Sequence, residues 1–145
     1  MSAKDLLDRL GTVLSVSADL SSDNTCALQF DDVGVHFEAA NGMLYVLTEL
    51  GTSPDIDSIA RRLLEANFLG EKTNGATLAL DRETGCVTLH AIFDENCSYD
   101  FFEKRLSQFV LAARYWRVWI SYSPESQNRT QDGEQSVGIE TTLMV

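Results

Sequence analysis

The sequence predicts one α+β domain in which three helices pack against a five-stranded antiparallel sheet, in the order α-β-β-β-α-β-β-α. Three observations predict this fold. Three stretches repeat apolar residues at helical spacing, shorter stretches are apolar in the manner of strands, and Gly- and Asp-containing turns separate the strands. The domain is expected over residues 1–122, and the polar residues 123–145 are expected to form a flexible C-terminal tail.

The first helix is predicted to begin after Ser2, whose hydroxyl can cap it, with Asp5 at the reciprocal position of a capping box. Its apolar stripe consists of Leu6, Leu7, Leu10, Val13 and Leu14. The polar residues 15–24 are expected to end the element.

Residues 25–50 are predicted to form a meander of three strands. A two-residue turn at Asp31-Asp32 keeps the apolar faces of the first two strands in register. The predicted pairs are Phe30 with Val33, Leu28 with Val35, and Cys26 with Phe37. The dipeptide Asn41-Gly42 is typical of the next hairpin turn.

The third strand is apolar on both faces. Leu44 and Val46 are expected to face the core, while Met43, Tyr45 and Leu47 point to the other side. Strands of this kind are usually covered on both faces, so we expect a second subunit or a partner to cover part of the sheet.

Two further helices and two strands complete the order. The second helix is expected to have Ser53 as N-cap and Pro54 as its first residue, with Gly70 at its C-terminal end. Strands are expected at 76–80 and 86–93. Ser98 is expected to open a long third helix, whose apolar stripe is Phe102, Leu106, Phe109, Ala113, Trp116 and Ile120.

Composition limits the classes of partner. The formal net charge is −11 at pH 7 and the isoelectric point is near 4.4, which disfavours nucleic acids and anionic lipids. No run of eighteen or more apolar residues occurs, and the first residues enter an amphipathic helix, so neither a membrane span nor a secretory signal is expected. We therefore expect a cytoplasmic protein that binds basic or neutral partners.

The sequence predicts neither a catalytic site nor a metal or cofactor site. Nucleotide-binding glycine motifs, HExxH and GxSxG are absent. Cys86 and His90 fall on one side of a predicted strand, but no third ligand or orienting acid follows at a predictable spacing. The pairs Asp31-Asp32 and Asp94-Glu95 lie in predicted turns, and Arg61-Arg62 is interpreted as a solvated helix face.

The two tryptophans have two interpretations. Trp116 and Trp119 could anchor a partner or pack in the core, because the third helix must also cover the sheet. The sequence as a whole has a good core, no assembled active site and more apolar surface than three helices and one sheet need, and this profile favours a binding module over an enzyme.

Several segments resemble the Tir-chaperone (CesT-like) family of type III secretion chaperones. The resemblance rests on LLEANFLG at residues 63–70 and on the glycine-led strand and acidic turn GATLALDRETG at 75–85. Two earlier segments are similar to the family as well. One is CALQFD at residues 26–31, and the other is residues 42–50, which lead into Gly51 and Pro54. The resemblance covers roughly residues 3–120. It implies a small cytoplasmic homodimer that binds the N-terminal region of a secreted effector in extended form.

The resemblance also implies two sets of binding residues, by position. Effector-binding residues would be Leu6, Leu10, Val13, Leu28, Phe30 and Val35. Residues of the dimer interface would be Ile59, Leu63, Ala66, Phe68 and Leu78. Two further candidate partners are the ATPase of the secretion apparatus and a regulatory protein.

Three alternatives remain open on sequence grounds. The same fold could bind an anti-activator or a small secreted regulator and so couple secretion to transcription. A small hydrolase with Cys86 or Cys97 as nucleophile would need a depressed thiol pKa. The third alternative is a dimeric scaffold unrelated to secretion.

Overall fold

The structure is a computed structural model, and it describes residues 1–122. The predicted C-terminal tail, 123–145, lies outside the described residues. The elements are α1 (Ala3–Leu14), β1 (Thr25–Phe30), β2 (Val33–Ala40), β3 (Met43–Gly51), α2 (Ile56–Ala66), a 3-10 turn η1 (Phe68–Gly70), β4 (Thr77–Leu80), β5 (Val87–Asp94) and α3 (Tyr99–Ser121). The predicted α-β-β-β-α-β-β-α order is confirmed.

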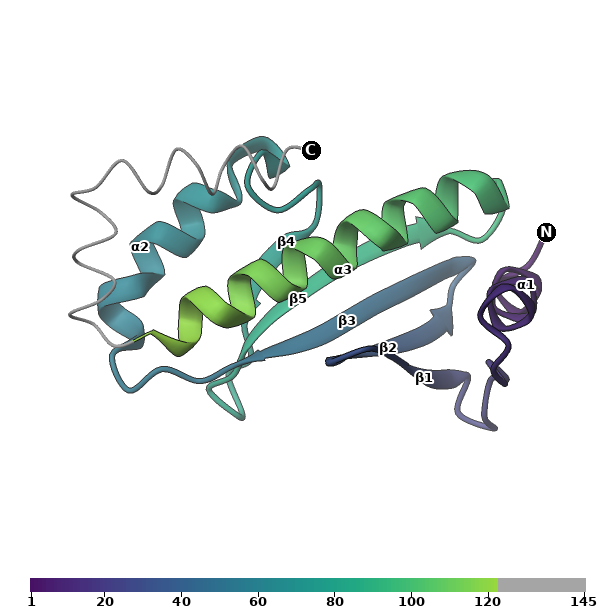
Figure 1. Cartoon of the computed structure of the whole chain (residues 1–145), viewed down its shortest axis with the longest axis horizontal. Helices are drawn as coiled ribbons and strands as arrows, with labels where there is room; N and C mark the ends of the chain where they lie inside the picture. Colours follow the sequence, from purple (N-terminus) through teal and green to yellow (C-terminus); the bar gives the residue numbers. More distant parts are fainter. Residues whose placement is uncertain (123–145) are drawn as a thin grey trace.

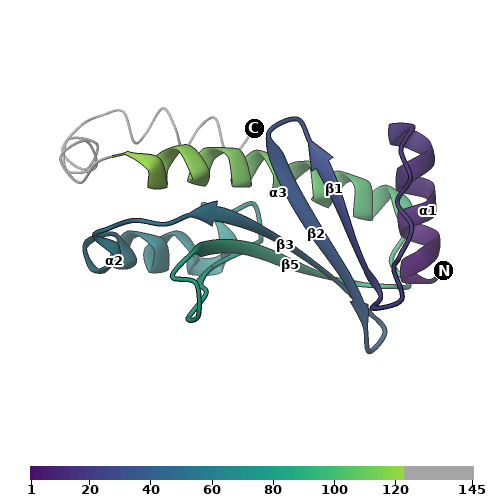
Figure 2. The ribbon, with the colours of Figure 1, turned by 90° about the horizontal axis from the view of Figure 1, so that it is seen from below.

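The five strands form one antiparallel sheet in the order β1-β2-β3-β5-β4. The helix α3 runs across one face of this sheet, while α1 lies at the β1 edge and α2 at the β4 edge (Figures 1 and 2). The sheet therefore has a helix beside each of its two edges.

The β1–β2 register is the predicted one. Phe30 pairs with Val33, Leu28 with Val35 and Cys26 with Phe37, around a turn in which Asp31 has a positive φ of 56°. On β3, Leu44 and Val46 are buried whereas Tyr45 and Leu47 are exposed, so the two predicted faces of this strand are confirmed.

The core lies between the sheet and α3. The largest fully buried side chains are Phe37, Phe102, Phe109, Leu6, Leu7, Leu44, Leu89, Val33, Val35, Val46 and Val87. The whole predicted stripe of α3 is buried, including Trp116. Trp119 is buried too, so both tryptophans pack inside the domain instead of presenting a free anchor.

The starts of α1 and α3 agree with the predictions, whereas the start of α2 does not. Ser2 and Asp5 form the expected capping box on α1, and the Ser98 hydroxyl accepts from Phe101 N–H at the start of α3. The predicted start of α2 was wrong. Ser53 Oγ accepts from Asp55 N–H within a turn, Pro54 lies in that turn, and the helix begins at Ile56.

Gly70 has the predicted left-handed backbone, with φ of 70°, but it closes η1 and not α2. The helix itself ends at Ala66, and the chain continues through Asn67 into the 3-10 turn.

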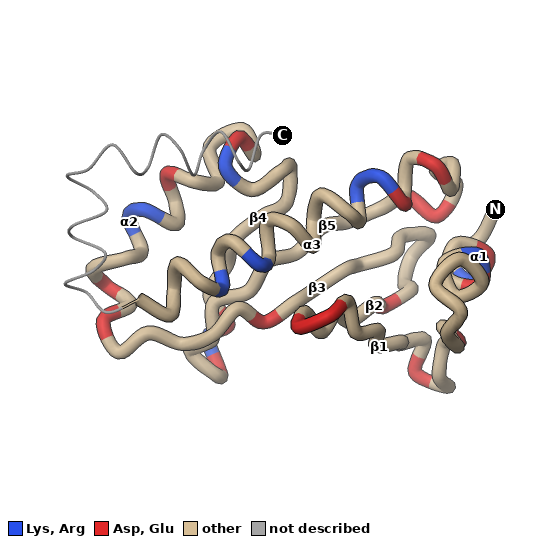
Figure 3. The backbone as a smooth tube through the Cα atoms, viewed as in Figure 1, with Lys and Arg blue, Asp and Glu red and all other residues tan. Residues whose placement is uncertain are grey.

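Charged residues are distributed unevenly over the fold. Acidic residues mark many of the turns, whereas basic residues appear along α3 and α2 (Figure 3). Over residues 1–122, no helix is both long and apolar enough to cross a membrane.

Candidate functional site

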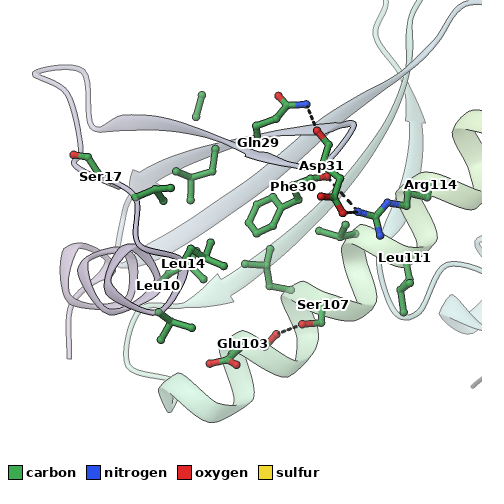
Figure 4. Close-up of a pocket in the computed structure, with 16 residues that line it drawn as sticks. Leu10, Leu14, Ser17, Gln29, Phe30, Asp31, Glu103, Ser107, Leu111 and Arg114 are labelled. Carbon is green, nitrogen blue, oxygen red and sulfur yellow. Dashed lines mark hydrogen bonds and ion pairs between the residues drawn. The ribbon is translucent and has the colours of Figure 1, made fainter.

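A groove of about 810 Å³ lies between α1, β1 and α3 (Figure 4). We call it the α1–β1–α3 groove. Its apolar lining is Leu10, Val13, Leu14, Val16, Ala27, Leu28, Phe30, Leu106, Val110 and Leu111. Val13 and Leu111 are 55% and 53% exposed, so the groove presents apolar surface that the described chain leaves uncovered.

The end of α1 shapes one wall of the groove. Ser15 adopts a left-handed backbone and ends the helix, and Val16 N–H then bonds Gly11 O at 2.9 Å. A Cβ at Gly11 would lie only 2.7 Å from Val16 O, so glycine lets the chain fold back closely over the helix. This return leaves Val13, Leu14 and Val16 along the groove.

The adjacent edge of β1 has unpaired main-chain groups. In a two-residue hairpin the residues flanking the turn form a hydrogen-bonded pair, and hydrogen-bonded and non-bonded pairs then alternate. The N–H and C=O of Ala27 and Gln29 consequently point away from β2. Thr25 shares this orientation, and Ser21 N–H bonds its carbonyl at 2.8 Å. Ala27 and Gln29 have no such main-chain partner within residues 1–122.

Arg114 of α3 holds the β1–β2 turn at one end of the groove. Its Nη2 lies 2.9 Å from Asp31 Oδ2 and 3.3 Å from Phe30 O, and its Nε lies 3.3 Å from Asp32 Oδ1 (Figure 4). Arg117 also donates to Asp32 O. The hydrogen bond from Arg114 lowers the pKa of Asp32.

These ion pairs are largely exposed, so they contribute little to the free energy of unfolding. They connect the β1–β2 turn to α3 at one end of the groove. The Asp31-Asp32 pair was interpreted from sequence as a turn, which is confirmed, but its contact with α3 was not predicted.

The nominated effector-binding residues separate into two groups. Leu10, Val13, Leu28 and Phe30 line the groove. Leu6 and Val35 are fully buried in the core and do not line it. A binding role for all six residues stays a prediction.

Sequence reasoning missed the wall that α3 contributes. Leu106, Val110, Leu111 and Arg114 line the groove, and none was nominated. One signal was available: Leu111 lies outside the buried stripe of α3 and is nevertheless apolar.

A second, smaller hollow of about 180 Å³ lies between α2 and β4. It is lined by Ile56, Ala60, Leu63, Leu64, Asn67, Leu78, Ala79 and Leu80. Among the nominated dimer residues, Phe68 is 68% exposed, whereas Ile59, Leu63, Ala66 and Leu78 are buried within the chain. Their role in a dimer also stays a prediction.

Asn67 joins α2 to the outer edge of β4. Its Nδ2 donates to Leu78 O at 2.8 Å, and its Oδ1 accepts from Leu78 N–H at 2.7 Å. The side-chain amide thus pairs with both main-chain groups of Leu78, as a neighbouring strand would. It blocks strand addition at this position, whereas Ala27 and Gln29 on the β1 edge have no outward main-chain partner among residues 1–122.

The candidate nucleophiles are poorly suited to catalysis. Burial raises the pKa of the Cys97 thiol, and also that of Cys26, which is the opposite of the shift that activates a cysteine. Cys86 is buried and lies 3.5 Å from Val87 O. Within residues 1–122, no group of three or more His, Cys, Asp or Glu side chains is arranged to hold a metal ion.

Several solved structures of protein complexes contain a chain with a similar fold. The chain is similar to a structure described as the ExsC–ExsE complex, with 21% identity, a TM-score of 0.67, and coverage of 83% of this chain and 97% of the other. A HopA1–SchA chaperone–effector complex has 21% identity, a TM-score of 0.66, and coverage of 79% and 91%.

A third similar structure is the heterodimeric ExoU–SpcU complex from the type III secretion system of Pseudomonas aeruginosa, with 19% identity, a TM-score of 0.65, and coverage of 82% and 98%. No curated protein matches the sequence significantly. Residues 5–117 match the profile of the Tir chaperone protein (CesT) family, in agreement with the resemblance seen in the sequence. The chain therefore belongs to the Tir chaperone protein (CesT) family.

Proposed function

We propose that this protein is a type III secretion chaperone that binds the N-terminal region of a secreted effector in extended form along the α1–β1–α3 groove. The observation that carries the proposal is the combination of uncovered apolar side chains with an open strand edge in one groove. Family membership supports it, as do the chaperone–effector complexes among the similar structures.

The energetics favour an extended occupant that uses both features. Ordering an unfolded segment costs about 1–2 kcal/mol per residue in backbone entropy. At about 25 cal/mol per Å² of apolar burial, this corresponds to roughly 40–80 Å² for each ordered residue. Main-chain bonds to Ala27 and Gln29 would contribute about 0.5–1.5 kcal/mol each. Strand addition therefore lowers the apolar burial that a partner must supply.

The proposed role is binding without catalysis. It requires no cofactor and no metal, because the groove offers apolar and main-chain contacts and the raised thiol pKa of Cys97 is unsuited to a nucleophile. The expected location is the bacterial cytoplasm, where effectors await export.

The protein is also proposed to act as a homodimer through the α2–β4 side. Leu64 is 72% exposed and lines the hollow between α2 and β4. Phe68 is 68% exposed and lies in η1, just after α2. A second copy would cover these side chains. Phe68→Asp should shift the molar mass measured by light scattering from dimer to monomer, whereas Phe101→Asp, an exposed phenylalanine on α3, should not.

Affinity purification from the native bacterium under secretion-inducing conditions tests the proposed function. Mass spectrometry should identify one secreted protein at stoichiometric level, and deletion of its N-terminal hundred or so residues should abolish its recovery. Stoichiometric recovery of a transcriptional regulator in its place would favour the alternative, regulatory function. Recovery of no secreted protein would contradict the chaperone function.

A further inference from the structure

The dipeptide Asn-Gly occurs twice in the sequence, at Asn41-Gly42 and at Asn74-Gly75. Both copies have a left-handed backbone at both residues. Asn41 and Gly42 have φ of 55° and 76°, and Asn74 and Gly75 have φ of 53° and 84°. Positive φ at two successive residues is what the Asn-Gly pair tolerates best. The fold therefore contains two sites of the same chemistry and the same local conformation, which can be compared directly.

Asn-Gly is prone to deamidation, because glycine has no side chain to hinder its own main-chain nitrogen. That nitrogen gives up its proton to water and attacks the asparagine Cγ, so a new C–N bond closes a succinimide ring. The bond from Cγ to the side-chain nitrogen breaks, and this nitrogen takes up a proton and leaves as ammonia. Water then opens the ring at either carbonyl and gives aspartate or isoaspartate. The reaction requires a carboxamide that can turn toward the main chain and a glycine nitrogen that is free to attack.

The structure holds both reacting groups at Asn74-Gly75. Asn74 Nδ2 donates to Gln108 O on α3 at 3.0 Å, and this side chain is partly buried. Gly75 N–H donates to Gly70 O, also at 3.0 Å. Ring closure at this site must first break both hydrogen bonds, which slows the reaction by at least about tenfold.

Both reacting groups at Asn41-Gly42 are accessible. This exposed pair forms the turn between Ala40 of β2 and Met43 of β3. Among residues 1–122, neither the Asn41 carboxamide nor the Gly42 N–H has a hydrogen-bond partner. Gly42 is tied to the next turn through its carbonyl, which accepts from Glu95 N–H at 3.1 Å. This bond leaves the nitrogen of Gly42 open to attack on Asn41.

We propose that Asn41-Gly42 is a deamidation site of the folded protein, whereas Asn74-Gly75 is protected by its hydrogen bonds. The product changes the turn in two ways. A new carboxylate appears at residue 41, close to Glu95, whose Oε1 lies 4.0 Å from the position of a Cβ on Gly42. Isoaspartate also inserts an additional carbon atom into the main chain of a two-residue turn, whose geometry has no room for it.

Incubation of the purified full chain in mildly alkaline buffer tests this selectivity. Peptide mapping by mass spectrometry, with isoaspartate labelled by an isoaspartyl methyltransferase, should show conversion at Asn41 at least about tenfold faster than at Asn74. In guanidinium chloride the hydrogen bonds of Asn74 and Gly75 are lost, and the two rates should agree within about threefold. Asn41→Gly is the control: glycine accepts the positive φ and has no carboxamide, so this variant should release little ammonia while folded.

Three results would overturn the proposal. The first is equal conversion of the two sites in the folded chain, or faster conversion of Asn74. The second is a preference for Asn41 that persists undiminished in guanidinium chloride, because neighbouring residues in the sequence would then cause it and not the structure. The third is an Asn41 that reacts in guanidinium chloride but stays intact in the folded chain.

Discussion

Asn67 provides a sharp test of how the LLEANFLG segment stabilises the fold. Its amide makes two hydrogen bonds with the main chain of Leu78, at 2.7 and 2.8 Å. Asn67→Ala removes both bonds and leaves the partly buried N–H and C=O of Leu78 without a side-chain partner. Each hydrogen bond contributes about 1 kcal/mol net, so the free energy of unfolding should fall by about 2 kcal/mol.

Asn67→Asp separates hydrogen bonding from side-chain size. The carboxylate can still accept from Leu78 N–H, but its second oxygen faces Leu78 O, where the native amide donates. Two acceptors then oppose each other, and we expect a loss at least as large as in Asn67→Ala. Asn96→Ala is the matched control, because Asn96 is an exposed asparagine in the turn after β5. Its effect should stay within about 0.5 kcal/mol.

Urea denaturation at one fixed protein concentration measures these differences, since dimerisation would make apparent stability depend on concentration. With a slope of about 2 kcal/mol per molar urea, the Asn67 variants should unfold about 1 M earlier than the wild type. A shift below about 0.3 M in both variants would refute the assignment of Asn67 as a structural link between α2 and β4.

Two further predictions concern backbone conformation and an unpaired hydroxyl. Gly75 has φ of 84°, a backbone conformation that strains any other residue, so Gly75→Ala should lower the free energy of unfolding by about 1–3 kcal/mol. The Arg105 guanidinium near the new Cβ is the end of a flexible side chain and can move aside. Gly34→Ala, in a strand, should change the free energy of unfolding by less than about 1 kcal/mol. Equal effects of the two changes would contradict this. The Tyr99 hydroxyl is buried without a hydrogen-bond partner among the described residues, so Tyr99→Phe should leave stability at pH 7 unchanged or raised. Burial, together with the nearby Glu103 carboxylate, raises the pKa of Tyr99 to about 12, so the unfolded chain, with a tyrosine pKa near 10, loses this proton first. Wild-type stability should therefore fall between pH 10 and 12 more steeply than that of Tyr99→Phe, and parallel pH profiles would contradict the raised pKa.

The sequence predicted those parts of the fold that depend on local patterns. The pairing of Phe30 with Val33 followed from a two-residue turn and alternating apolar residues, and the structure has the same pairing. The Ser98 cap and the buried stripe of α3 followed from helical spacing. The start of α2 was wrong because a Ser-Pro pair also suits a turn, and Ser53 bonds Asp55 N–H there.

The groove could be predicted only in part, because it depends on contacts between distant segments. Leu10, Val13, Leu28 and Phe30 were nominated by position in the family, yet the α3 wall depends on how α3 crosses the sheet. Arg114 and Asp31 are 83 residues apart in the sequence, and no local pattern links them. Leu6 is buried in the core, although it belongs to the same apolar stripe of α1 as the exposed Val13. Helical periodicity alone does not show which residues of such a stripe are buried.

The most direct test of the central claim is the affinity of the co-purified effector's N-terminal fragment for two single variants on one helix face. Leu111 lines the groove, and Val118 lies two turns further along the same face of α3; each is 53% exposed. Leu111→Asp removes about 1 kcal/mol of apolar burial and places a carboxylate in the interface. Calorimetry should show a Kd raised at least tenfold for Leu111→Asp and changed less than threefold for Val118→Asp, with both variants folded. Equal affinities for Leu111→Asp and the wild type would contradict binding in the α1–β1–α3 groove.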